Sequence, residues 1–148
     1  MAKYSSPNLS FEIARTDGGA LTSGFSQYIT KFGEINITRP LIESTPFAAS
    51  IAQYLVSIFK KYEPFTVEGF FDDAATTGPD AVLNIGKYAN VAYRQFILTL
   101  GGSKTITGDG VAGTGGGLWI VNYKRTFNVG EYHTYSCELQ ATGTIVEA

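Results

Sequence analysis

The sequence predicts a mainly β fold, a β-sandwich or barrel of about six to seven strands with one flanking α-helix and long loops. Ten Phe, nine Tyr, one Trp and 17 Gly stand in 148 residues, while only 16% of the residues are charged. Aromatic side chains favour strands and Gly favours turns. Several short segments also alternate between apolar and polar residues, as half-buried strands do. The length suits a single domain spanning 1–148.

The first strand is predicted at Leu9–Arg15, where Leu9, Phe11 and Ile13 alternate with polar residues. The segment 16–19 reads Thr-Asp-Gly-Gly, which is a turn signal. A second extended stretch is predicted at 25–39, interrupted near Lys31–Gly33.

A helix is predicted over about 46–61. Thr45 suits the N-cap and Pro46 suits the first helical position. Lys60 and Lys61 would then lie in the last turn, where cations complement the helix dipole. Four apolar residues recur at helical spacing and predict the face that packs on the sheet: Phe47, Ile51, Leu55 and Ile58.

Four further strands are predicted after the helix, at Phe65–Phe71, Val91–Leu100, Leu118–Val129 and Glu131–Ala141. In the third of these, alternation predicts that one side carries Trp119, Val121, Tyr123 and Phe127. Long loops are predicted at 16–24, 72–90 and 101–117, the last because of its high glycine content.

The chain has little material for catalysis or for cofactors. Cys137 and His133 are the single residues of their kinds, and four positions along one strand separate them by about 13 Å at roughly 3.3 Å per residue. The segment Gly108–Gly113 fits a dinucleotide-binding pattern, but no helix is predicted after it. We therefore expect no enzyme activity, no cofactor and no metal.

The charge and the chain ends limit the partners. A net charge of -2 and a pI near 5.3 argue against a basic nucleic-acid-binding surface. Neither a signal peptide nor a membrane span is predicted, so we expect synthesis in a cytosol and no membrane insertion.

Two alternative functions remain open on the residues alone. A small enzyme would use the acidic loop with Asp72, Asp73 and Asp80, although a solvated turn is the commoner role for such residues. A carbohydrate-binding β-sandwich would stack Trp119 or tyrosines on sugar rings and hydrogen-bond hydroxyl groups through Asp72 or Asp109.

The long, weakly charged loops favour a third function, self-assembly. Interface cores are depleted in charged side chains, and partners would order loops that are mobile alone. Contacts between copies that close produce rings, and contacts that do not close produce filaments.

Four segments resemble the tail tube (major tail) proteins of long-tailed bacteriophages. The resemblance extends from about Phe25 to Thr144, and its sharpest part is the Glu-Gly-Phe-Phe-Asp-Asp sequence inside the second segment. The segments are Thr45-Pro46-Phe47, Phe65–Asp73, Thr76-Thr77-Gly78-Pro79 and Tyr135–Gly143.

The resemblance implies a β-sandwich or barrel with a flanking helix. Six copies would form a ring, and rings would stack into a hollow tube that conducts double-stranded DNA, with long loops that reach to the next ring. The resemblance also implies a virion location after synthesis in the host bacterial cytoplasm. The implied partners are further copies of the chain and tape-measure, tail-tip and tail-terminator proteins.

Candidate site residues follow from this resemblance. Glu34, Glu68 and Glu138 are candidates for the lumen, where carboxylates would repel DNA phosphates, although an outward polar face accounts for them equally well. Candidates for contacts between copies or rings, which ordinary surface loops would equally explain, are Asp72, Asp73, Gly78, Pro79, Gly108, Gly110, Gly113 and Gly117.

Overall fold

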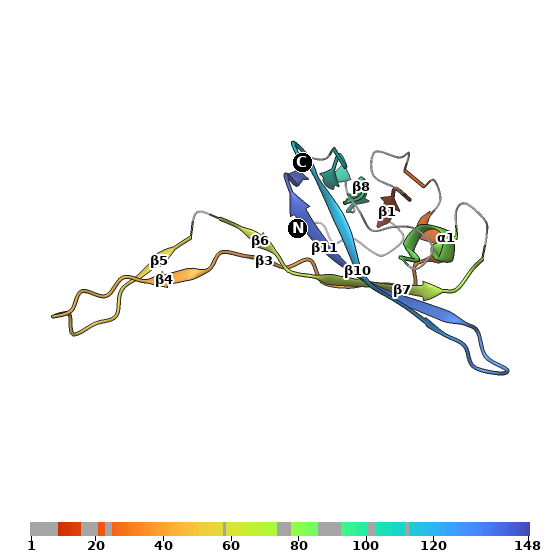
Figure 1. The fold of residues 1–148 in the computed structure, drawn as a ribbon, viewed down its shortest axis with the longest axis horizontal. Coiled ribbons are helices and arrows are strands. Elements are labelled where there is room, and N and C mark those ends of the chain that lie inside the picture. Colours follow the sequence, from red (N-terminus) through yellow and green to blue (C-terminus); the bar gives the residue numbers. More distant parts are fainter. Residues whose placement is uncertain are drawn as a thin grey trace.

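The body of the protein is built from two antiparallel sheets that enclose the core (Figure 1). The computed structural model describes residues 9–15, 21–22, 25–57, 59–73, 78–85, 93–100, 103–111 and 113–148. One four-stranded sheet has the order β1 (Ser10–Ile13), β8 (Phe96–Thr99), β9 (Thr105–Gly108) and β12 (Val146–Glu147). The other has the order β10 (Gly116–Thr126), β11 (Thr134–Gly143), β7 (Phe65–Phe70) and β2 (Lys31–Phe32).

The core receives side chains from both sheets and from two short helices, η2 (Phe25–Tyr28, a 3-10 helix) and α1 (Pro79–Leu83). The strands supply core side chains because successive residues of a strand point to opposite faces of the sheet. Every second residue of β7 and β11 is accordingly buried. Its largest apolar members include Phe11, Phe25, Phe65, Phe96, Leu118, Tyr135 and Leu139. The predicted mainly β class is confirmed.

A long hairpin leaves the body and extends away from it at the left of Figure 1. Its two ladders pair β3 (Ile37–Thr38) with β6 (Lys61–Tyr62), and β4 (Leu41–Glu43) with β5 (Tyr54–Val56). We call residues 36–63 the arm.

The predicted helix at 46–61 is wrong, because these residues form the tip and the returning strand of the arm. A chain turn lies at Phe47 and Ala48, and the Gln53 N–H donates to the Thr45 hydroxyl at 2.9 Å. An amphipathic helix is stabilised mainly by packing its apolar face on a core. The arm projects beyond the core, so helical spacing of apolar residues does not produce a helix there. The α-helix that the described residues contain, α1, begins at Pro79 inside a predicted loop.

Smaller differences have local causes. The stretch 25–28 is a 3-10 helix rather than a strand, and the predicted interruption at Lys31 is itself a strand. The glycine-rich stretch 101–117 contains β9 and the start of β10. The prediction that Trp119, Val121, Tyr123 and Phe127 share one side of β10 is wrong. A bulge between Ile120 and Asn122 leaves Val121 half exposed and moves the alternation by one residue.

Candidate assembly surfaces

The arm exposes apolar side chains on both of its faces. Leu41 lies opposite Val56 on one face, and Ile42 lies opposite Leu55 on the other. Each of these four side chains is 54–64% exposed, and Glu43 is the one charged residue in the segment 41–57. An isolated two-stranded ribbon has marginal stability in water. The arm therefore has the composition of a buried element without a core of its own chain to cover it.

Polar contacts at the base of the arm set its direction. The Tyr62 hydroxyl donates to Glu147 of β12 at 3.1 Å, and the Gln140 side chain of β11 donates to the Tyr62 carbonyl at 2.7 Å. Burial, followed by the hydrogen bond to Glu147, raises the pKa of Tyr62 to about 12. The arm base is thus attached to both sheets of the body.

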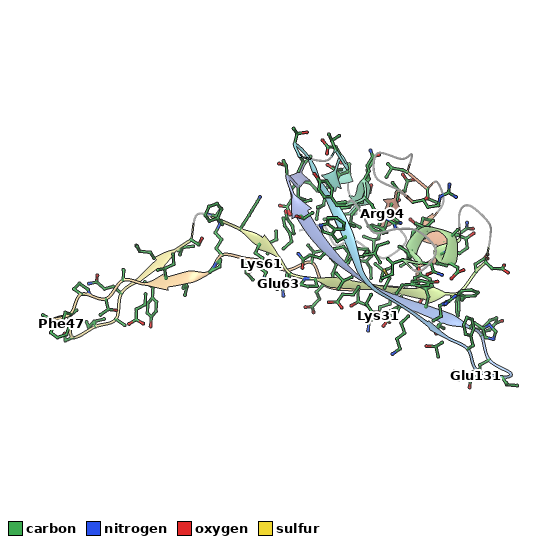
Figure 2. The ribbon with its side chains drawn as sticks, in the orientation of Figure 1. Lys31, Phe47, Lys61, Glu63, Arg94 and Glu131 are labelled. Atoms are coloured by element: carbon green, nitrogen blue, oxygen red, sulfur yellow. The ribbon has the colours of Figure 1, made fainter. Side chains whose placement is uncertain are left out.

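A second apolar projection lies at the far end of the β10–β11 hairpin, where Figure 2 labels Glu131. The tilted rings of Phe70 and Tyr132 have centroids 5.4 Å apart, and Phe127 contacts the rings of both Phe71 (5.1 Å) and His133 (4.8 Å) edge-on. We call this set the end cluster: Phe70, Phe71, Phe127, Val129, Tyr132 and His133. Tyr132 and Val129 are almost fully exposed, at 83% and 105%.

The three acidic residues predicted for the lumen lie on one face, the outer face of the sheet β10-β11-β7-β2. Glu68 lies opposite both Lys31 and Ser136, and Glu138 lies opposite Thr66 in the neighbouring row. Glu34 lines the same surface depression as Lys31, Thr66 and Glu68. Lys124 lies on this face opposite Ser136, so the carboxylates alternate with two lysines and several hydroxyl groups.

The eight loop candidates are placed differently from one another. Gly78 and Pro79 begin α1 and are buried, while Asp72 and Asp73 follow β7. Gly108, Gly110 and Gly117 are buried too, whereas Asp73 and Gly113 are exposed.

Close packing of the backbone explains the buried glycines. A Cβ on Gly108 would lie 2.6 Å from the Gly116 carbonyl oxygen, and one on Gly117 would lie 2.9 Å from the Tyr93 ring. These glycines serve the packing of their own chain, and a role in contacts between copies stays a prediction.

The residues of the two alternative functions contact their own chain. Asp80 pairs with Arg125 at 3.2 Å and accepts a hydrogen bond from Tyr123. Asp109 accepts from the Val111 N–H, and the half-buried Trp119 packs edge-on against Tyr93. Among the described residues, no group of three or more His, Cys, Asp and Glu side chains could hold a metal ion. No helix in the described ranges is long and apolar enough to cross a membrane.

Sequence reasoning missed the arm and the end cluster as surfaces. The signal for the arm was present, because seventeen residues, 41–57, contain a single charge. The end cluster had a weaker signal, the aromatic residues around the turn at Gly130.

Comparison with solved structures gives matches over the whole chain. A chain of the native gene transfer agent virion matches with a TM-score of 0.67 at 10% identity, covering 99% of each chain. A chain of the sixfold-symmetrised anti-feeding prophage baseplate matches with a TM-score of 0.69 at 8% identity, covering 100% of this chain and 97% of that one. A chain of the empty gene transfer agent tail, refined with helical C6 symmetry, matches with a TM-score of 0.70 at 10% identity, covering 99% of each.

No protein-family model matches the sequence, and no curated protein matches it. The structural matches show a shared fold. The resemblance predicted from the sequence is therefore confirmed at the level of fold, because chains of phage-like tail particles have this fold.

Proposed function

We propose that the chain is a structural subunit of a phage-like tail, which assembles with copies of itself into stacked hexameric rings and so forms a hollow tube that conducts DNA. The observation that carries this proposal is the arm, which is apolar on both faces and lies outside its own core. Burial of exposed apolar surface drives association between proteins. The matched tail particles, two of which were treated with sixfold or C6 symmetry, support the same architecture.

In this proposal the whole span 1–148 is one tail-tube domain, and the outer face of the sheet β10-β11-β7-β2 lines the lumen. Glu34, Glu68 and Glu138 would there repel phosphate groups, while the hydroxyl groups between them keep the wall hydrated. DNA would pass without adhering to the wall. The subunit itself performs no catalysis.

The proposed partners are further copies of the chain along the tube, with tape-measure, tail-tip and tail-terminator proteins inside the tube and at its ends. The proposed location is the virion, after synthesis in the cytoplasm of the bacterial host.

Electron microscopy and sedimentation of the concentrated protein test this function. We expect tubes of constant diameter above a threshold concentration for the full chain. Leu55→Asp places a charge on one arm face and should abolish the tubes, whereas Leu55→Ile keeps the apolar surface and should retain them. Monomers of the full chain at every concentration, also with preformed tube ends added as seeds, would contradict the proposal.

A further inference from the structure

We propose that the arm of one copy docks onto the end cluster of the next copy, so that copies join head to tail. This inference rests on the proposed self-assembly and names the two surfaces that meet. The contact would join an apolar ribbon to a set of partly exposed aromatic rings.

The two surfaces lie at opposite ends of the same strand. Phe65 begins β7 next to the arm base and pairs with Leu139 of β11. Phe70 ends β7 in the end cluster and pairs with Thr134 of β11. Figure 2 shows the consequence, with Phe47 at one extreme of the molecule and Glu131 near the other. When two copies join through two different surfaces, the pair still has one free arm and one free end cluster. Further copies can therefore add in the same direction.

The chemistry of the two surfaces matches. Phe127 is 52% exposed and Phe70 is 50% exposed, so a large part of each ring remains to be covered. Partly exposed aromatic residues are typical anchors of interfaces, because they bury much area at little conformational cost. The arm supplies aliphatic side chains on both faces, and either face can cover the rings.

The charges around the two surfaces favour a second copy as the occupant. The arm stretch 36–47 spans about 40 Å at roughly 3.3 Å per residue, so in the proposed contact it would extend past the tip of a neighbour's β10–β11 hairpin. When the two projections overlap in this way, the tip of one copy approaches the arm base of the other. Glu131 is exposed at the tip, while Arg39 and Lys60 are exposed near the arm base, so opposite charges would meet.

A mixing experiment tests the pairing of these two surfaces. Leu55→Asp disables the arm and Tyr132→Asp disables the end cluster, and both positions are exposed, so the body should fold in each variant. We expect neither variant to form tubes alone. An equal mixture should form particles that are two copies long in the direction of joining. The intact arm of Tyr132→Asp can dock on the intact end cluster of Leu55→Asp, and the surfaces left free on this pair are both disabled. Tyr132→Phe, which keeps the ring, should form tubes as the unmodified chain does.

Several outcomes would overturn the pairing while the proposed function survives. One is tube formation by Tyr132→Asp at the same threshold concentration as the unmodified chain. Another is a mixture whose particles are no larger than those of the separate variants. A third is that the unmodified chain floats with phosphatidylcholine vesicles and Leu55→Asp does not, while Tyr132→Asp still forms tubes. These results would assign the arm to a membrane instead. Absence of tubes from the unmodified chain overturns the proposed function itself.

Charge reversal gives a second, independent test. Glu131→Lys should slow assembly at low salt and reverse the salt dependence of the assembly rate, because a complementary pair becomes a repulsive one that salt screens. Adding Lys60→Glu in the same chain should restore the rate. Failure of the second change to restore it would count against the proposed overlap.

Discussion

Gly69 lies directly under the carbonyl oxygen of Tyr28, at the end of η2. A Cβ at this position would collide with that oxygen and lie 3.0 Å from the ring of Tyr135. The Tyr135 hydroxyl donates to the same carbonyl at 2.9 Å, so the contact is fixed from two sides. The glycine in the segment 65–73, which resembles tail tube proteins, therefore has a packing role that the sequence alone did not reveal.

We expect Gly69→Ala to lower the free energy of unfolding by about 3 kcal/mol, because backbone must move to admit the methyl group. Urea unfolding followed by fluorescence measures this change. Gly130→Ala is the control: its φ is 82° but nothing lies within 4 Å of the added Cβ, so only the conformational cost of about 1 kcal/mol applies. Equal losses in the two variants would contradict the packing role.

Cys137 is a buried thiol on the core side of β11, and burial raises its pKa to about 12. Because the thiolate is the reactive form, we expect alkylating reagents to label the folded protein only at the rate at which it unfolds. Labelling of the native protein as fast as a free thiol would contradict this placement.

The same pKa shift predicts a loss of stability at high pH. The thiol stays neutral in the folded state while the unfolded chain ionises above its ordinary value of 9.0, so this contribution is complete below pH 9 and declines toward pH 12. Relative to Cys137→Ala, the free energy of unfolding should fall by about 1.4 kcal/mol for each pH unit above 9.

At the scale of elements, the sequence predicts strands correctly where one face meets the core. β1, β7 and β11 each alternate in the sequence and in the structure, because burial imposes that pattern on them. The arm is different, since both of its faces are apolar and exposed and none of residues 41–56 belongs to the core. Local spacing then fits a helix as well as a hairpin, and the pairing of 41–43 with 54–56 decides between them.

Removing the outer arm should leave the body stable. The Ser57 N–H donates to the Pro40 carbonyl at 2.8 Å, so residues 41–56 can be replaced by an Asn-Gly turn that joins the two strands directly. None of the removed residues belongs to the core, and the free energy of unfolding should change by less than about 1 kcal/mol. The shortened chain should stay monomeric. A loss above about 3 kcal/mol would show that the arm stabilises its own body.

For the whole molecule, Glu34, Glu68 and Glu138 lie on one face of the sheet β10-β11-β7-β2, and their role in a lumen stays a prediction. The sequence pattern did not predict that Lys31 and Lys124 lie among them, because strand order decides which residues lie side by side across a sheet. Strand order is set by long-range pairing that no local pattern encodes.

Charge reversal on this face tests its proposed role as the lumen wall. We expect Glu68→Lys combined with Glu138→Lys to assemble normally but to retain nuclease-protected DNA at low salt, because the wall then attracts phosphates. Glu12→Lys, a like change on β1 of the opposite sheet, should not protect DNA from nuclease. Equal protection by both variants, or by neither, would contradict the assignment.

The central claim is that other copies of the chain cover the arm, and hydrogen exchange of the arm backbone measures this directly. In the monomer, amides of residues 36–63 should exchange far faster than those of β7 and β11, because a solvent-exposed ribbon opens easily. In the assembled tube, the same amides should become protected by at least about tenfold, the effect of about 1.4 kcal/mol of added local stability. Arm amides that exchange equally fast in monomer and tube would contradict the account.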